Sequence, residues 1–142
     1  MPTNTAGSAG LVNADSNGPH VNKAVIRYSD WVGTNNDRKV LFVLPAGAVV
    51  LPAPISNVIV KTAFNDTTGD DLDVGVEGTD DDLFASAIDL NTGSGVLLTL
   101  DDLADANRYS ATARTVTANF TTAPTGDGTT GEVVVTIGYF IV

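Results

Sequence analysis

Carboxylates are the side chains of this sequence with the clearest capacity for chemistry, and they occur in groups. The groups are Asp66, Asp70, Asp71 and Asp73; Asp80, Asp81 and Asp82; and Asp101, Asp102 and Asp105. Calcium takes six to eight oxygen ligands, and carboxylates commonly supply them. The segment Asn65–Gly75, NDTTGDDLDVG, has suitable atoms but not the alternating spacing, with glycine at the sixth position, of an EF-hand loop. The pattern therefore favours solvated turns, and we predict no metal ligand.

Other catalytic chemistries find little support. A pair of carboxylates can hydrolyse glycosides, but the sequence does not fix their separation, and few aromatic residues are available as a sugar platform. His20 is the only histidine and ends a polar segment, so the rigid partners of a triad or a zinc site are not expected around it. We predict that His20 is solvent-exposed. The tract Thr125–Gly131 lacks the lysine of a phosphate-binding loop and is predicted to be a hairpin connection. We therefore predict no catalytic residue, no cofactor and no enzyme.

The composition limits the classes of partner. The chain has 142 residues, which suits one domain with a substantial core. It carries 17 acidic and 7 basic residues, and the net charge of -10 opposes binding to nucleic acid and to anionic membrane surfaces. There is no cysteine, which excludes disulfides and thiolate sites. The first twenty residues lack a basic region followed by an apolar run, so secretion through a signal segment is not expected.

The uncharged stretch Val40–Val60 has the length of a membrane span but not its composition. Pro45, Pro52 and Pro54 would each interrupt a helix. The residues between them are largely β-branched or aromatic and form short runs, which is typical of buried strands joined by tight turns. We therefore predict a soluble β-protein core here.

Strand patterns recur along the rest of the chain. Together they indicate about eight strands in one antiparallel, all-β domain over residues 21–142. The predicted strands are 24–29, 39–44, 48–51, 55–64, 71–77, 96–100, 112–122 and 132–142. Because the last strand is strongly apolar, we expect it inside a sheet and not at an exposed edge.

Three segments depart from the strand pattern. Asp80–Ile88 and Asp101–Arg108 both open with acidic residues, which suit the N-terminus of a helix, so each is predicted to be able to form a helical turn. Residues 1–20 are rich in Gly, Ala, Ser, Thr and Asn. They are predicted to form a flexible N-terminal arm, because they have too little apolar surface to order themselves.

A family resemblance adds to this architecture. The segment LPAGAVVL (Leu44–Leu51) is followed by a strand ending in Thr62–Phe64, an acidic turn, the strand LDVG (Leu72–Gly75), Gly78-Thr79, an acidic run and Phe84. This succession resembles the capsid decoration, or cement, proteins of tailed bacteriophages. The resemblance covers about Val40–Phe84 and extends more loosely through the strands at 112–122 and 132–142.

The resemblance implies a jelly-roll β-sandwich that binds the major capsid protein on the outer surface of the virion and stabilises the head. It also implies a homotrimer, and it carries no catalytic residues. Within the arm, Leu11 and Val12 are the apolar residues that we expect to contact the capsid. The alternative is a sandwich module of a tail or head fibre that binds a host-surface glycan.

Overall fold

The computed structural model describes residues 18–30, 38–67, 70–92, 96–99, 103–124 and 126–142. Leu11, Val12 and most of the predicted arm lie outside the described residues, as do Asp101 and Asp102. The described elements, in chain order, are β1 (His20–Arg27), the 3-10 turn η1 (Tyr28–Asp30), β2 (Arg38–Leu44), β3 (Ala48–Val50), β4 (Asn57–Thr62), β5 (Asp71–Val76), β6 (Asp80–Asp89), β7 (Val96–Thr99), α2 (Asp105–Arg108), β8 (Arg114–Thr122) and β9 (Glu132–Ile141).

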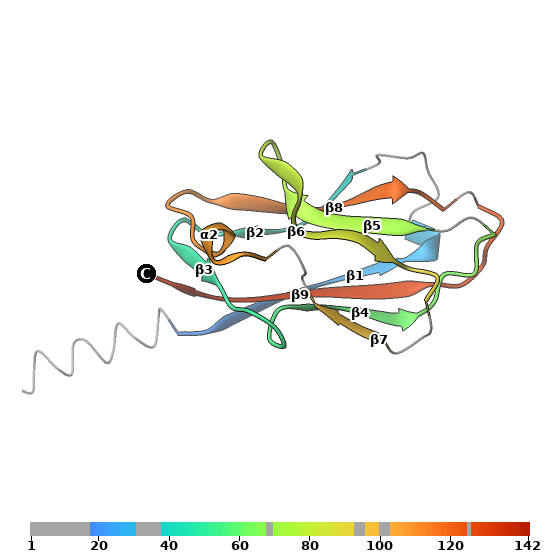
Figure 1. The fold of residues 1–142 in the computed structure, drawn as a ribbon, viewed down its shortest axis with the longest axis horizontal. Coiled ribbons are helices and arrows are strands. Elements are labelled where there is room, and N and C mark those ends of the chain that lie inside the picture. Colours follow the sequence, from blue (N-terminus) through green and yellow to red (C-terminus); the bar gives the residue numbers. More distant parts are fainter. Residues whose placement is uncertain (1–17, 31–37, 68–69, 93–95, 100–102, 125) are drawn as a thin grey trace, which may run out of the picture.

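The strands form two antiparallel sheets stacked as the layers of a sandwich (Figure 1). Sheet A has the order β1-β9-β4-β7, and β3 also pairs with β9. Sheet B has the order β2-β8-β5-β6. The chain therefore changes sheet after β1, β2, β4, β6, β7 and β8. The predicted all-β antiparallel sandwich is confirmed.

The core lies between the two layers, where alternate residues of each strand point inward. In β9, Val133, Val135 and Ile137 are fully buried. Three phenylalanines supply much of the volume: Phe64 after β4, Phe84 on β6 and Phe120 on β8. This apolar layer fixes which face of each strand remains outside.

The stretch from Val40 to Val60 forms the end of β2, all of β3 and the start of β4, with the prolines in the connections. At the first connection the amide of Ala48 donates to the carbonyl of Pro45 at 3.2 Å, and Gly47 has a φ of 81°. A Cβ at Gly47 would also lie 2.8 Å from the carbonyl oxygen of Val142, so this tight turn requires glycine. Among the described residues, no helix is long and apolar enough to cross a membrane.

The predicted helical turn at Asp80–Ile88 is wrong, because Asp80–Asp89 is strand β6. Its ladder with β5 contains two register shifts, and Ala87 has a φ of 50°. These irregularities break the two-residue alternation by which a strand is recognised in a sequence. In the second predicted segment, α2 forms a single turn at Asp105–Arg108. The described part of the chain thus has nine strands, one more than the sequence indicated, and the additional strand is β6.

The final strand lies inside sheet A, as its sequence predicts. β9 pairs with β1 along one edge, and with β4 and then β3 along the other. The described part of the tract predicted as a connection, Gly126–Gly131, lies between β8 and β9.

Candidate functional site

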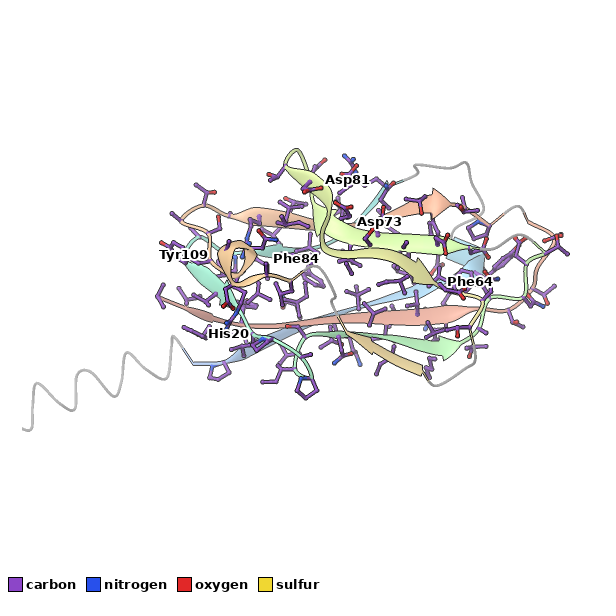
Figure 2. The ribbon with its side chains drawn as sticks, in the orientation of Figure 1. His20, Phe64, Asp73, Asp81, Phe84 and Tyr109 are labelled. Carbon is purple, nitrogen blue, oxygen red and sulfur yellow. The ribbon has the colours of Figure 1, made fainter. Side chains whose placement is uncertain are left out.

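The acidic residues lie in separate places on the sandwich. Asp66 and Asp70 lie between β4 and β5, Asp71 and Asp73 lie on β5, Asp80–Asp82 begin β6, and Asp105 begins α2. Figure 2 shows Asp73 and Asp81 on the side of sheet B that faces away from sheet A. Within the described ranges, no group of three or more histidine, aspartate or glutamate side chains is arranged to hold a metal ion.

Asp66 belongs to a hydrogen-bonded network at one end of the sandwich. The Tyr28 hydroxyl donates to Asp66 Oδ2 at 3.1 Å and accepts from the amide of Gly128 at 2.8 Å. Burial raises the pKa of the Tyr28 phenol, and the Asp66 carboxylate adds to this rise. The network ties η1 to the connection between β8 and β9, so these groups have a structural role.

A second contact holds the same connection. The side-chain oxygen of Asn65 accepts from the amides of Thr129 and Thr130, at 2.7 and 2.9 Å. The side-chain amide of Asn65 also donates to Thr129 Oγ1. An asparagine side chain that satisfies adjacent backbone amides fixes the path of a loop.

Asp70 is the most unusual acidic group of the described chain. It is fully buried, and neither carboxylate oxygen has a hydrogen-bond partner among the described residues. Its backbone amide donates to Asn91 Oδ1 at 2.5 Å, which fixes the residue in place. Burial raises the pKa of its carboxyl group to about 6, and the neighbouring Asp66 carboxylate adds to the rise. The Asp70 carboxyl group is therefore mostly protonated below about pH 6 and mostly ionised above it.

The acidic run Asp80–Asp82 lies over the outer face of sheet B. A Cβ at Gly75 of β5 would come within 2.2 Å of the Asp80 carbonyl oxygen and of the Asp81 carbonyl carbon, so the start of β6 rests directly on this glycine. The Arg38 guanidinium of β2 binds both oxygens of Asp81. An open depression of about 480 Å³ lies beside this pair and includes Asp73 and Asn119 in its lining.

Arg114, at the start of β8, is the one buried cation among the described residues. It donates to the carbonyl oxygens of Asn107 and Arg108, at 2.6 and 3.0 Å, and its guanidinium carbon lies 5.5 Å from the Phe84 ring centroid. Burial lowers its pKa. Because both carbonyls belong to the end of α2, Arg114 holds that turn against β8.

His20 differs from its prediction. It is half-buried in β1, and its ring stacks on Tyr139 with 5.1 Å between centroids. Its Nε2 atom is buried and has no hydrogen-bond partner in the described part of the chain. The expected solvent-exposed histidine is therefore wrong, because residue 20 already pairs with β9. Figure 2 shows His20 well apart from Asp73 and Asp81.

Sequence reasoning missed the exposed apolar residues. The large ones are Val21, Val40, Val43, Ile55, Tyr109 and Val142. Val40, Val43, Ile55 and Val142 stand in or beside the same apolar runs as core residues, so only the pairing of strands separates them from the core. The sequence holds no signal that separates the exposed residues from the buried ones, because apolar residues occupy both faces of these strands.

The fold has known counterparts, although neither a protein-family model nor a curated protein sequence matches the chain. A chain of the capsid asymmetric unit of cyanophage Pam1 superposes with a TM-score of 0.62 and 18% identity, over 87% of this chain and 85% of that one. A chain of the capsid of Ralstonia phage GP4 gives 0.58 and 20%, over 87% and 84%. A chain of the acidic stable capsid of Helicobacter pylori bacteriophage KHP30 gives 0.55 and 20%, over 87% of both. These similarities establish a shared fold over most of each chain.

Proposed function

We propose that this protein is a structural component of a bacteriophage virion, and more specifically a decoration protein that binds the outer surface of the capsid and stabilises the head. The observation that carries the proposal is the shared fold, which spans 87% of the chain in three capsids from different phages. The chain and its counterparts are similar in length, since 84 to 87% of each counterpart is also covered.

The order of strands supports the jelly-roll form of the sandwich. Each sheet contains early and late strands of the chain, since β1 and β9 are neighbours in sheet A and β2 and β8 are neighbours in sheet B. The strands therefore pair from the two ends of the chain inward, as when a long hairpin is rolled up.

The described groups fit a binding role better than a catalytic one. Asp66, Asn65 and Arg114 all hold connections of the backbone in place, and the depression beside Arg38 and Asp81 is open. We therefore propose a protein without enzymatic activity whose partner is the major capsid protein.

A homotrimer and a contact through the N-terminal arm remain part of the proposal. Three linked copies would turn each later contact into an intramolecular event, which can raise avidity by roughly 10² to 10⁴. Leu11 and Val12 are the proposed apolar contacts of the arm. Deleting residues 1–19 should leave the sandwich folded and weaken capsid binding, because β1 begins only at His20.

The test is an add-back experiment. Virions stripped of this protein are mixed with the purified chain, and both the bound amount and the temperature of genome release are measured. Saturable binding with a higher release temperature is expected. If the chain does not bind the stripped particles but binds host cells, and soluble glycan competes with that binding, the fibre alternative is correct instead.

A further inference from the structure

The outer face of sheet A carries apolar side chains that do not pack in the core. Because Val133, Val135 and Ile137 of β9 point into the core, the alternate residues Val134 and Thr136 point outward. Both are only half-buried. In antiparallel sheets, residues paired in register lie on the same face, so the register identifies the other outward positions.

An apolar row crosses three strands of this face. Val25 of β1 pairs with Val134, and Val134 pairs with Ile59 of β4. All three side chains are half-buried, although valine and isoleucine are usually found in protein interiors. Val21, which pairs with Gly138 in the same sheet, is 61% exposed, and Ile55, whose side chain lies over Gly138, is 48% exposed. The described residues thus leave two apolar groups uncovered on this face, separated by the polar row of Lys23, Thr136 and Asn57. Uncovered apolar surface of this kind commonly marks interaction sites.

Basic residues border this row. Arg27 and Lys61 both contact Glu132, at 3.5 and 3.1 Å, so the three side chains share the outer face. Lys23 lies on the same face, because it pairs with Thr136, and its side chain is exposed. Three basic residues against one acidic residue leave this face with two positive charges in excess, on a chain whose net charge is -10.

We propose that the outer face of sheet A is the surface by which this protein docks, and that its partner is a protein surface with an apolar centre and surrounding carboxylates. This inference rests on the proposed function, under which the partner surface belongs to the capsid shell. Charge complementarity is the argument for an acidic partner. Because the net charge of the chain is -10, an acidic surface attracts it only where the chain is locally positive, as on the outer face of sheet A.

A second copy of the chain is a poorer occupant of this face. Two sheet A faces related by a twofold axis would bring Lys23, Arg27 and Lys61 of one copy towards the same residues of the other, and like charges across an interface oppose association. A twofold contact through this face is therefore disfavoured. The shell protein is the proposed occupant, and self-association, including contact of this face with an acidic face of another copy, is an outcome that the experiment must detect.

Two substitutions test the surface in add-back binding to stripped virions. Lys23→Glu reverses a charge on an exposed side chain, and Val25→Ser removes apolar surface from the β1 end of the row. We expect each to weaken binding by at least about tenfold, a change of about 1.4 kcal/mol. The loss from Lys23→Glu should shrink at high salt, since salt screens exposed charges, whereas the loss from Val25→Ser should not.

The control is the double variant Thr112→Glu/Thr121→Glu, which changes the net charge by the same amount as Lys23→Glu. Thr112 precedes β8 and Thr121 lies near its end, and both are exposed and outside sheet A. Circular dichroism and thermal melting confirm that each variant folds, and light scattering reports its oligomeric state.

The outcomes separate the two proposals. If the wild-type chain binds and Lys23→Glu and Val25→Ser bind equally well, the docking face is wrong while the proposed function stands. If either variant instead changes the oligomeric state and leaves particle binding intact, the face joins copies of the chain and the inference is overturned. If the wild-type chain does not bind stripped virions, the proposed function fails, and the shell partner fails with it.

Discussion

The outer faces of sheets A and B are made by the same kind of strand but end in opposite environments. On sheet B, the start of β6 folds back over Gly75, Arg38 binds Asp81, and the polar side chains of Thr117 and Asn119 become buried. On sheet A, Val25, Val134 and Ile59 are apolar and yet stay half-open to solvent. The middle of the outer face of sheet B is thus covered by its own chain, although Val40 and Val43 of the edge strand β2 remain exposed on that face. The apolar row of sheet A is left uncovered among the described residues. Burial here follows the path of the connections as much as the polarity of the side chains.

The outer faces of the two sheets differ in how they contribute to stability and to binding. A face covered by its own backbone contributes to the stability of the domain, whereas an open apolar face gains most when another molecule covers it. Substitutions on sheet B should therefore change folding, and conservative substitutions on sheet A should change folding little.

Gly75→Ala should have the largest effect on stability. The new Cβ would come within 2.2 Å of backbone atoms of Asp80 and Asp81, which cannot rotate away as a side chain can. We expect unfolding free energy to fall by about 3 kcal/mol, in the upper range for overpacking. Denaturant titration measures the change. Gly138→Ala on sheet A is the control. Its Cβ would lie 2.4 Å from the Cγ2 methyl of Ile55, whose side chain is 48% exposed and can shift, and the nearest backbone atom, the His20 carbonyl oxygen, lies 3.7 Å away, so about 1 kcal/mol is expected. Equal losses would remove the contrast between the faces.

Asp70 should make stability depend on pH. Its pKa is about 6 in the folded chain, above the ordinary value of 3.8, because burial penalises the charged form. The folded state therefore holds a proton more tightly than the unfolded state does. Stability should rise as the pH falls through 6 and level off near pH 4, where the unfolded carboxyl is also protonated. Thermal melting from pH 8 to pH 4 measures this.

Asp70→Asn removes the buried charge and should raise the melting temperature at pH 8 while flattening the profile around pH 6. Glu77→Gln, at an exposed residue of the β5–β6 connection, removes the same formal charge. It should leave the step near pH 6 in place. If both variants flatten the profile equally, the dependence arises from net charge and not from the buried site.

Thr117→Val should stabilise the protein. The Oγ1 atom of Thr117 is buried under the β5–β6 region and has no hydrogen-bond partner in the described residues, so it is desolvated without compensation. Replacing the hydroxyl with a methyl group of similar size should raise unfolding free energy by about 1 kcal/mol. Thr136→Val on sheet A is the matched control and should change it little, because Thr136 is only half-buried and its hydroxyl can reach water. A loss of stability in Thr117→Val would show that the hydroxyl is satisfied.

Arg38→Met should have the smallest effect, and a local one. The Arg38 and Asp81 side chains are 38% and 40% exposed, and pairs of this kind contribute less than about 1 kcal/mol. Amide hydrogen exchange should become faster at Glu77 and Asp82 and stay unchanged in β9. Unchanged exchange at the start of β6 would mean that the contact with Gly75 alone holds this segment down.

Much of the sandwich could be predicted from the sequence, because short β-branched runs separated by proline and glycine are read directly as strands. β6 could not, since its three leading aspartates look like a helix N-terminus and its bulges break the alternation. The expectation of solvated turns is wrong for most of the acidic groups, because Asp71 and Asp73 lie on β5 and Asp80–Asp82 on β6. Asp66, Asp70 and Asp73 are buried, and the sequence did not distinguish Asp70 from its neighbours. Its burial depends on Asn91 and on the end of the sandwich, which lie far from it in sequence.

The outer face of sheet A was missed for a related reason. In VVVTIGYFIV the core residues and the outward residues are both apolar, so the sequence of β9 suggests burial on both sides. Only the register with β1 and β4, together with the exposure of Val21 and Ile55, shows that one side is open. A single sequence cannot supply that register when neither face is marked by polar residues.

The central position of β9 has a consequence for how the protein is made. Residues 132–141 provide the partner for β1, β3 and β4, so sheet A cannot assemble until this last strand has left the ribosome. The pairing of His20 with Tyr139 closes a loop of nearly the whole described chain, and such distant contacts form slowly, over milliseconds to seconds. Until then, β1 and β4 present unpaired apolar edges in a crowded cell, where copies of the same nascent chain are close together. The interval before β9 pairs with β1 and β4 is therefore the stage of folding at which aggregation is most expected.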